Sequence, residues 1–189
     1  MVDQAAVDEI RVQLLRRIAA GDRQALAELY DHLGAALYST AVRILGDGQE
    51  AEEVMQDVFV QVWEKAAAFD AALGTPTNWV MRIARNRAID RLRARQRRLR
   101  ALEEFESALA VELAPRPAHA GALSGEELTG VRVAVRSLPP EQRQAIELAF
   151  FGGLSHGEIS AALNEPLGTV KARIRRGMLR LKDTLQPYA

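Results

Sequence analysis

Cysteine is absent from this chain of 189 residues, and aromatic residues make up only 5% of it. Without cysteine the protein forms no disulfide and offers no thiolate to a metal, and a reducing compartment is permitted. The three histidines, His32, His119 and His156, are scattered and lack the paired spacing of metal ligands. The sequence also holds no nucleophile and base set and no phosphate-binding loop. We therefore predict no metal, no cofactor, no catalytic residue and no enzyme.

Long apolar runs are also missing, since none approaches the roughly 20 residues that a membrane-spanning helix requires. The N-terminus, with Asp3, Asp8 and Glu9, does not have the pattern of a secretory signal. These two observations predict no membrane insertion and a cytoplasmic location. Strand signals are almost absent, whereas the abundant Ala, Leu, Arg, Glu and Gln favour helices. The fold class predicted from composition is all-α.

The chain lacks net charge as well, because 25 basic residues balance 25 acidic ones. The charges are nevertheless segregated: residues 82–100 hold nine arginines and one acid, and residues 171–182 hold six cations and no acid. Residues 47–64 show the reverse, with six acids and no cation. Local fields, rather than the net charge, steer partners. The pattern predicts two contacts with a polyanion and one acidic surface that suits a basic protein.

The clearest motif lies near the C-terminus, where residues 154–176 predict two short helices joined by a tight turn. Ser155 and Glu158 have the spacing of a capping box, and Pro166 and Gly168 mark the break between the helices. The second helix carries one apolar row, which comprises Val170, Ile174, Gly177, Leu181 and Leu185. Cations occupy its other faces, which is typical of the recognition helix of a helix-turn-helix. An ordinary surface helix with a solvated basic face is the alternative interpretation.

Four helices are predicted before residue 100, at about 7–20, 22–45, 49–67 and from 75 into the arginine cluster. In the first helix, Ile10, Leu14 and Ile18 form the expected apolar row. Thr75 and Pro76 suit the cap and first turn of the fourth helix. The expected core includes Val54, Met55, Val58, Val62 and Ile83. For Trp79 the pattern leaves a core position and a DNA-facing position equally open.

After residue 100 the helical pattern decays, and the Pro-rich run at 114–121 predicts a flexible linker. Ser124 and Glu127 have the spacing of a second capping box, followed by helices at about 125–137 and 140–150. The predicted organisation is a first domain at 1–100, a linker at 101–123 and a second domain at 124–189.

Several runs in these two domains resemble extracytoplasmic-function (ECF) sigma factors, the two-domain branch of the bacterial sigma-70 family. In the first domain the matching runs are AEEVMQDVFVQVW at 51–63 and NWVMRIARNRAIDRLR at 78–93. In the second they are LPPEQRQAI at 138–146 and LGTVKARI at 167–174. The resemblance implies a sigma-2-like helical bundle and a sigma-4-like helix-turn-helix domain. It also implies a specificity subunit that binds core RNA polymerase and directs promoter-specific transcription initiation.

The resemblance assigns the polymerase contact to the acidic helix. In the family, this helix binds the clamp coiled coil of the largest polymerase subunit. The matching positions here are Glu53, Gln56, Asp57, Val60 and Trp63. The acidic surface expected from charge alone agrees with that assignment.

The resemblance further implies that the first domain reads and melts the −10 element. The matching positions are Trp79, Arg82, Asn86, Arg87 and Arg91. The resemblance places Asn86 beside a pocket for a flipped base, and the amide suits that role because it offers both a donor and an acceptor to a base edge. The segment from 69 to 78 would shape that pocket. The arginines at 95–100 are either part of this footprint or a solvated tail.

For the second domain the resemblance implies recognition of the −35 element by the helix after the turn. The matching positions are Thr169, Lys171, Ala172, Arg173, Arg175 and Arg176. Arginine bidentate to guanine is the commonest specific contact of such a helix. Many relatives carry Ser where this chain has Ala172, so a hydroxyl contact is replaced by an apolar one.

The resemblance also implies an anti-sigma factor that clamps the two domains and holds the protein inactive. Two other classes remain open from the residues alone. One is a stand-alone helix-turn-helix regulator, which would bind duplex DNA without polymerase at a two-fold site. The other is a helical adaptor whose basic faces bind RNA or acidic proteins.

Overall fold

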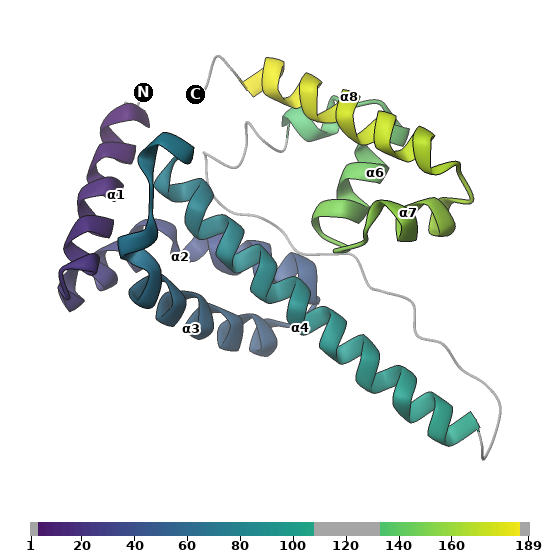
Figure 1. Ribbon diagram of the computed structural model, residues 1–189, viewed down its shortest axis with the longest axis horizontal. Coiled ribbons are helices and arrows are strands. Elements are labelled where there is room, and N and C mark those ends of the chain that lie inside the picture. Colours follow the sequence, from purple (N-terminus) through teal and green to yellow (C-terminus); the bar gives the residue numbers. More distant parts are fainter. Residues whose placement is uncertain (1–3, 108–132, 186–189) are drawn as a thin grey trace. The chain divides into compact units, whose positions relative to one another are not determined.

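The computed structural model describes residues 4–107 and 133–185, and its regular elements in these ranges are all helical (Figure 1). The all-α prediction is therefore confirmed. The chain divides into two compact units, residues 1–122 and 123–189. Each unit has its own hydrophobic core, and each is described separately below.

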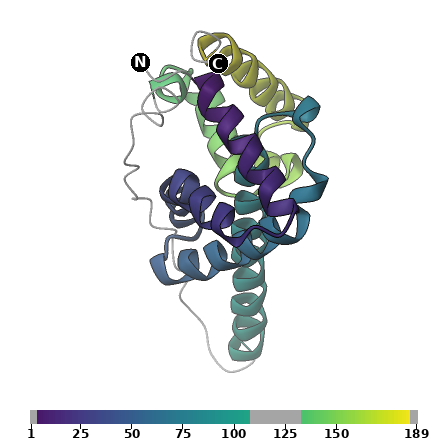
Figure 2. The same ribbon diagram turned by 90° about the vertical axis from the view of Figure 1, so that its left-hand side faces the viewer.

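The first unit consists of four α-helices and two short 3-10 turns. The helices are α1 (Gln4–Ala19), α2 (Arg23–Leu45), α3 (Gly48–Lys65) and α4 (Pro76–Ser107), and the turns are η1 (Ala66–Ala68) and η2 (Ala71–Leu73). Helix α2 packs against the other three helices. Figures 1 and 2 show that the C-terminal part of α4 extends beyond α1, α2 and α3.

Local hydrogen bonds fix the ends of these helices where the sequence predicts them. Asp22 caps α2 by accepting hydrogen bonds from the backbone N–H groups of Gln24, at 2.9 Å, and Ala25, at 3.2 Å. Gly46 ends α2 at a φ of 70°, which a residue without a Cβ adopts readily. The adjacent guanidinium of Arg17 donates to Asp22 and lowers the pKa of that carboxyl group.

The core of the first unit is built from one face of each helix. The buried apolar residues of α2, α3 and α4 include Leu29, Leu33, Leu37, Ala41, Ile44, Val54, Met55, Val58, Val62, Val80, Ala84 and Ala88. This confirms the predicted core positions in α3, whereas Ile83 is only half-buried because Val80 and Ala84 occupy the inner face of α4.

Two further expectations for this unit are wrong. Ile10 does not continue the apolar row of α1, since it is 50% exposed while Arg11 is only 4% exposed. Leu14, Leu15 and Ile18 are buried, so the inner face is rotated by one residue at the start of α1. The helical pattern also does not stop at residue 100, because α4 continues to Ser107.

The linker expected at 114–121 and the capping box of Ser124 and Glu127 lie outside the described residues. Of the helix expected at 125–137, the structure describes a helical turn at 133–136, which ends where the Ser137 N–H donates to the Val133 carbonyl at 2.9 Å. The domain boundaries remain a prediction.

The second unit contains α6 (Pro140–Phe150), α7 (His156–Leu163) and α8 (Leu167–Leu185). Ala134, Leu138, Ile146 and Leu181 form one cluster of its core, and Ala145, Ile159 and Val170 are also buried. Helices α6 and α8 approach closely at Gly177, where an added Cβ would lie 2.5 Å from Cδ1 of Ile146. The absence of a side chain at this position therefore sets how α8 rests on α6.

Candidate nucleic-acid and protein interfaces

Helices α7 and α8 form the helix-turn-helix that the sequence predicts. The Ser155 hydroxyl accepts from the Glu158 N–H at 3.3 Å, and the Glu158 carboxylate accepts from the Ser155 N–H at 2.7 Å. These two bonds complete the predicted capping box. Asn164 ends α7 at a φ of 51°, and α8 begins three residues later at Leu167.

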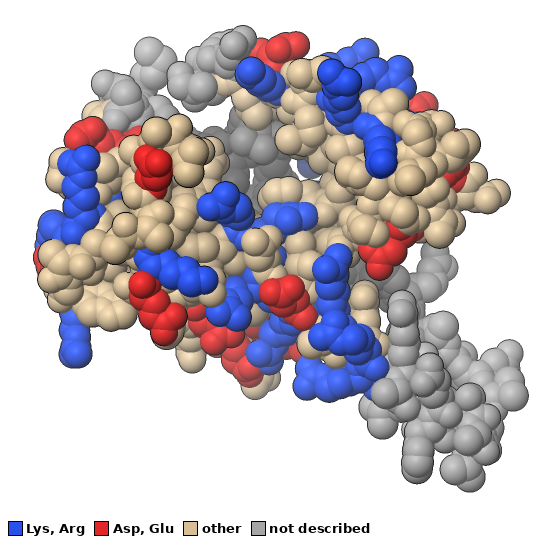
Figure 3. Space-filling view, in the orientation of Figure 1, with Lys and Arg blue, Asp and Glu red and all other residues tan. Residues whose placement is uncertain are grey.

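The cations of α8 lie on the faces around its buried row, and most of them are exposed. Val170, Gly177 and Leu181 are buried, and Ile174 is half-buried. Of the positions matched to −35 recognition, Lys171, Ala172, Arg175 and Arg176 are exposed, and Thr169 and Arg173 are half-buried. Basic side chains stand out over α8 in Figure 3. The N-terminal half of α8 therefore offers four exposed predicted positions to a groove of DNA.

Arg173 differs from the other cations of α8 because it has an acidic partner on the turn. Its guanidinium lies 2.9 Å from the carboxylate of Glu165, and the side chain is 20% exposed. The pair joins the turn to the first half of α8. Arg176 instead donates from Nε to the Ala172 carbonyl at 3.3 Å, one turn earlier on the helix.

The positions matched to polymerase binding lie on one outward face of α3. Glu53, Gln56, Asp57 and Val60 are exposed, and their spacing of three and four residues places them along a single stripe. Val60 is 57% exposed, which is unusual for an apolar residue in a helix whose other valines are buried. Trp63 is half-buried at the end of the stripe. A face of this kind combines negative charge with apolar area, as a protein partner requires.

The inner side of the arginine cluster on α4 is tied to α3 by ion pairs. Arg91 pairs with Glu53, and the Arg95 guanidinium lies 3.0 Å from the Glu50 carboxylate. Arg95 also donates to the Leu45 carbonyl at 3.0 Å, which holds α4 against the end of α2. The structure thus joins a position matched to −10 DNA, Arg91, with one matched to polymerase, Glu53.

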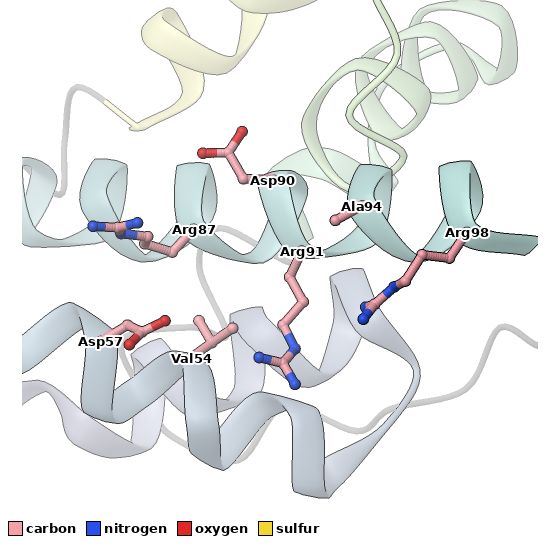
Figure 4. Close-up of a pocket in the computed structure, with 7 residues that line it drawn as sticks. All are labelled: Val54, Asp57, Arg87, Asp90, Arg91, Ala94 and Arg98. Atoms are coloured by element: carbon pink, nitrogen blue, oxygen red, sulfur yellow. The ribbon is translucent and has the colours of Figure 1, made fainter.

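A groove runs along this junction between α3 and α4. It is lined by Val54, Asp57, Arg87, Asp90, Arg91, Ala94 and Arg98. Figure 4 shows Arg91 reaching from α4 toward α3. The Nε of Arg87 is buried without a hydrogen-bond partner in the described part of the chain. Arg87 and Asp57, which were matched to different partners, therefore line the same groove.

The outward side of α4 carries the remaining predicted −10 positions. Arg82 and Asn86 are one turn apart and both exposed. Arg85 is half-buried beside them, and burial, followed by the charge of Arg93, lowers the pKa of its guanidinium. A guanidinium keeps its charge even so, since its pKa lies far above neutrality. This side of α4 is therefore a cationic surface, formed by Arg82 and Arg85, that also presents the carboxamide of Asn86.

The segment between α3 and α4 leads directly to this surface. Phe69 packs edge-on against Trp79, with ring centroids 5.8 Å apart. Trp79 is half-buried, so it is both a packing residue and partly accessible. The Thr75 hydroxyl accepts from the Asn78 N–H at 3.3 Å and caps α4, as predicted. Leu73 at the tip of the segment is 87% exposed.

Sequence reasoning missed several exposed apolar residues and one buried ion. Leu73, Phe150, Met178 and Leu179 are exposed. Met178 and Leu179 stand outside the apolar row predicted for their helix, so the spacing left a signal for these two. The buried Arg11 did leave a signal, since it lies three and four residues before Leu14 and Leu15 on the inner face of α1.

Residues 4–107 and 133–185 contain no group of three or more His, Cys, Asp or Glu side chains that could hold a metal ion. Among the helices described, none combines the length and the apolar character needed to cross a bilayer.

Comparison with known proteins identifies this arrangement. A helical bundle with an acidic outer helix, followed by a basic helix-turn-helix unit, defines a DNA-binding transcription factor of two parts. Two family models match the chain: Sigma-70 region 2 over residues 29–98 and Sigma-70 region 4 over residues 129–181.

Relatives that match over most of their length narrow the family assignment. The ECF RNA polymerase sigma factor SigK of Mycobacterium ulcerans is 37% identical over 172 residues, which cover 91% of each chain. SigK of Mycobacterium tuberculosis H37Rv is 36% identical over 91% of each chain. SigK of Mycolicibacterium vanbaalenii is 35% identical over 91% of this chain and 87% of its own. The chain belongs to the family of ECF RNA polymerase sigma factors, which are transcription initiation factors.

Solved structures of other sigma factors are also similar. Rhodobacter sphaeroides SigE, solved in complex with the anti-sigma ChrR, is 32% identical over 93% of this chain and 98% of its own, with a TM-score of 0.47. The sigma factor RpoE of Bartonella quintana, solved with the anti-sigma factor NepR, is 26% identical over 85% and 96% of the two chains, with a TM-score of 0.39.

Proposed function

We propose that this sigma factor binds core RNA polymerase through the outer face of α3 and contacts a promoter at two elements. The first unit takes the −10 element along the outward side of α4. The second unit takes the −35 element through α8. The observation that carries the proposal is the pairing, on one chain, of an exposed acidic stripe with an exposed cationic recognition helix.

The polymerase contact is assigned to Glu53, Gln56, Asp57, Val60 and Trp63. Carboxylates on a helix surface complement a basic partner and speed its docking. Val60 supplies apolar area that is 57% exposed in the free chain and is excluded from water once a partner covers it. The acidic stripe therefore offers both charge complementarity and apolar burial.

The −10 contact is assigned to Trp79, Arg82, Asn86, Arg87 and Arg91. Arg82 and Asn86 are exposed now, so the phosphate backbone and a base edge can reach them directly. Arg87 and Arg91 lie toward α3, and Arg91 is held by Glu53. For these two, DNA contact requires the side chain to turn away from α3.

The −35 contact is assigned to Thr169, Lys171, Ala172, Arg173, Arg175 and Arg176. Arg175 and Arg176 are exposed arginines suited to guanine or phosphate, and Ala172 offers a methyl group to thymine. Polymerase can be brought to a promoter through both elements without any reaction catalysed by this chain. We accordingly propose a non-enzymatic specificity subunit that acts in the cytoplasm. The family resemblance adds an anti-sigma factor as a partner.

A reconstituted transcription assay with purified core polymerase tests this proposal. The chain should direct start sites downstream of paired −35 and −10 elements, whereas a stand-alone regulator would bind duplex DNA without core and start no transcripts. Asn86→Ala should leave core binding unchanged and lower open-complex formation about tenfold, since one bidentate base contact is worth about 1–3 kcal/mol. Gln96→Ala, at another exposed polar position of α4, is the matched control. Equal opening by both variants would remove the assignment of Asn86.

A further inference from the structure

Arg11 is a buried charge in a helix that the proposed function leaves unused. Its side chain is 5% exposed, on the inner face of α1 beside Leu14 and Leu15. Arginine is almost never fully buried unless it is paired, because removing a charge from water is costly. A position of this kind therefore points to a specific role for its partners.

Those partners join the start of α1 to the start of α4. The Arg11 Nη1 group donates to the Thr77 hydroxyl at 2.9 Å and lies 3.6 Å from the Asp8 carboxylate. The Thr77 hydroxyl in turn lies 3.4 Å from the same carboxylate and donates to it. Thr77 is the second residue of α4, directly after the buried Pro76. The three side chains form one network across 69 residues of sequence.

Helix α1 contacts the chain both before and after residues 69–75, the segment that precedes α4. It packs against η1 at 66–68 and against α4, so it holds both ends of residues 69–75. Figure 1 shows this segment running beside α1. The segment contains η2 and the exposed Leu73. Its first residue, Phe69, packs against Trp79 of α4.

We propose that Arg11 is a positioning residue for −10 recognition, acting through Thr77. The network of Asp8, Arg11 and Thr77 fixes the first turn of α4, so residues 69–75 present one shape to the unpaired strand. A segment held at both ends loses less conformational entropy when it binds. The inference rests on the proposed −10 function of this segment. It assigns promoter selectivity to α1, outside the residues matched to DNA.

The test compares variants of the network with a variant elsewhere on α1. Thr77→Val keeps the branched shape but removes the hydroxyl, Thr77→Ser keeps the hydroxyl, and Arg11→Met removes the charge. Arg17→Met is the matched control, because Arg17 pairs with Asp22 and Glu28 at the opposite end of the same helix. Each full-length variant is measured for core polymerase affinity and for open-complex rate on promoters that differ at single −10 bases.

Thr77→Val and Arg11→Met should lower the open-complex rate about fivefold, which corresponds to one net hydrogen bond. They should also flatten the preference among −10 bases, while core affinity stays at the wild-type value. Thr77→Ser and Arg17→Met should retain the preference. An unchanged base preference in Thr77→Val would overturn the inference, as would a parallel loss of core affinity and opening. If the wild type itself opens no promoter with core, the proposed function fails rather than this inference alone.

Discussion

The two cationic regions of this chain look alike in sequence but differ in structure. Along α4, inward arginines are neutralised by acids of α3, as in the pairs Arg91 with Glu53 and Arg95 with Glu50. Along α8, the ion pair that the structure shows is Arg173 with Glu165, while Arg175 and Arg176 are exposed. Charge density in a sequence therefore does not measure the charge available to DNA.

The difference follows from what each helix packs against. Helix α4 lies beside α3, and residues 47–64, which include nearly all of α3, hold six acids. Helix α8, in contrast, rests on α6 through Gly177 and apolar side chains. Some of the arginines of α4 therefore stabilise the first unit, and the cations of α8 remain for a polyanion. Variants at these positions distinguish the arginines that stabilise the first unit from the cations that remain for DNA.

The largest effect is expected from reversing a charge on the acidic stripe. Asp57→Arg places a cation where a basic surface of polymerase should dock, and like-charge contact costs several kcal/mol. We expect the affinity for core to fall at least about 100-fold, measured by fluorescence anisotropy with labelled protein. Asp31→Arg makes the same change at an exposed position of α2 and should bind core normally. Normal co-purification of the Asp57 variant with core would contradict the assignment.

The next effect concerns an exposed cation of α8. Arg175→Ala in holoenzyme should weaken promoter binding by about 1–3 kcal/mol if the guanidinium reads a base. Gel shifts on wild-type and scrambled −35 elements measure this, with Arg180→Ala as a control farther along α8. Base readout predicts a loss confined to the wild-type element. Equal losses on both DNAs would reduce the contact to phosphate.

A smaller effect separates structural arginines from exposed ones within α4. Arg95→Met removes an ion pair and a bond to the Leu45 carbonyl, so the free energy of unfolding should fall by about 1 kcal/mol. Arg97→Met, at an exposed position, should change it by less than about 0.5 kcal/mol. Urea unfolding of both variants provides the comparison. Equal stabilities would mean that the inward arginines are not tied to α3 in solution.

The smallest effect is expected at the paired cation of α8. Glu165→Gln keeps the shape of the side chain but removes its charge, and such partly exposed pairs contribute about 0.2–1 kcal/mol. Thermal unfolding at low salt should reveal the loss. At about 1 M salt, where charges are screened beyond roughly 3 Å, the two proteins should unfold almost together. A loss that persists unchanged in salt would point to packing rather than charge.

Short-range features were predictable from the sequence because they depend on neighbours along the chain. The caps at Thr75 and Ser155 use hydrogen bonds that span three residues, and each forms as expected. The apolar row of α8 follows from helical spacing in the same way.

Long-range pairings could not be predicted in this way. Arg91 meets a residue 38 positions earlier, and Arg11 meets one 66 positions later. No pattern within a helix indicates which of two cationic sides will find acids, so the nine arginines of residues 82–100 looked equivalent. Ile10 was misplaced because Arg11, which meets Thr77 of α4, occupies the inner face of α1 in its place.

The central claim is that both cationic surfaces engage one promoter while polymerase holds the acidic stripe. Footprinting of a promoter fragment with this chain, with core polymerase, and with both together tests it most directly. We expect simultaneous protection of the −35 and −10 elements, with an opened −10 region, only when both proteins are present. Protection by the chain alone of equal extent, or protection of a single element in the complex, would contradict it.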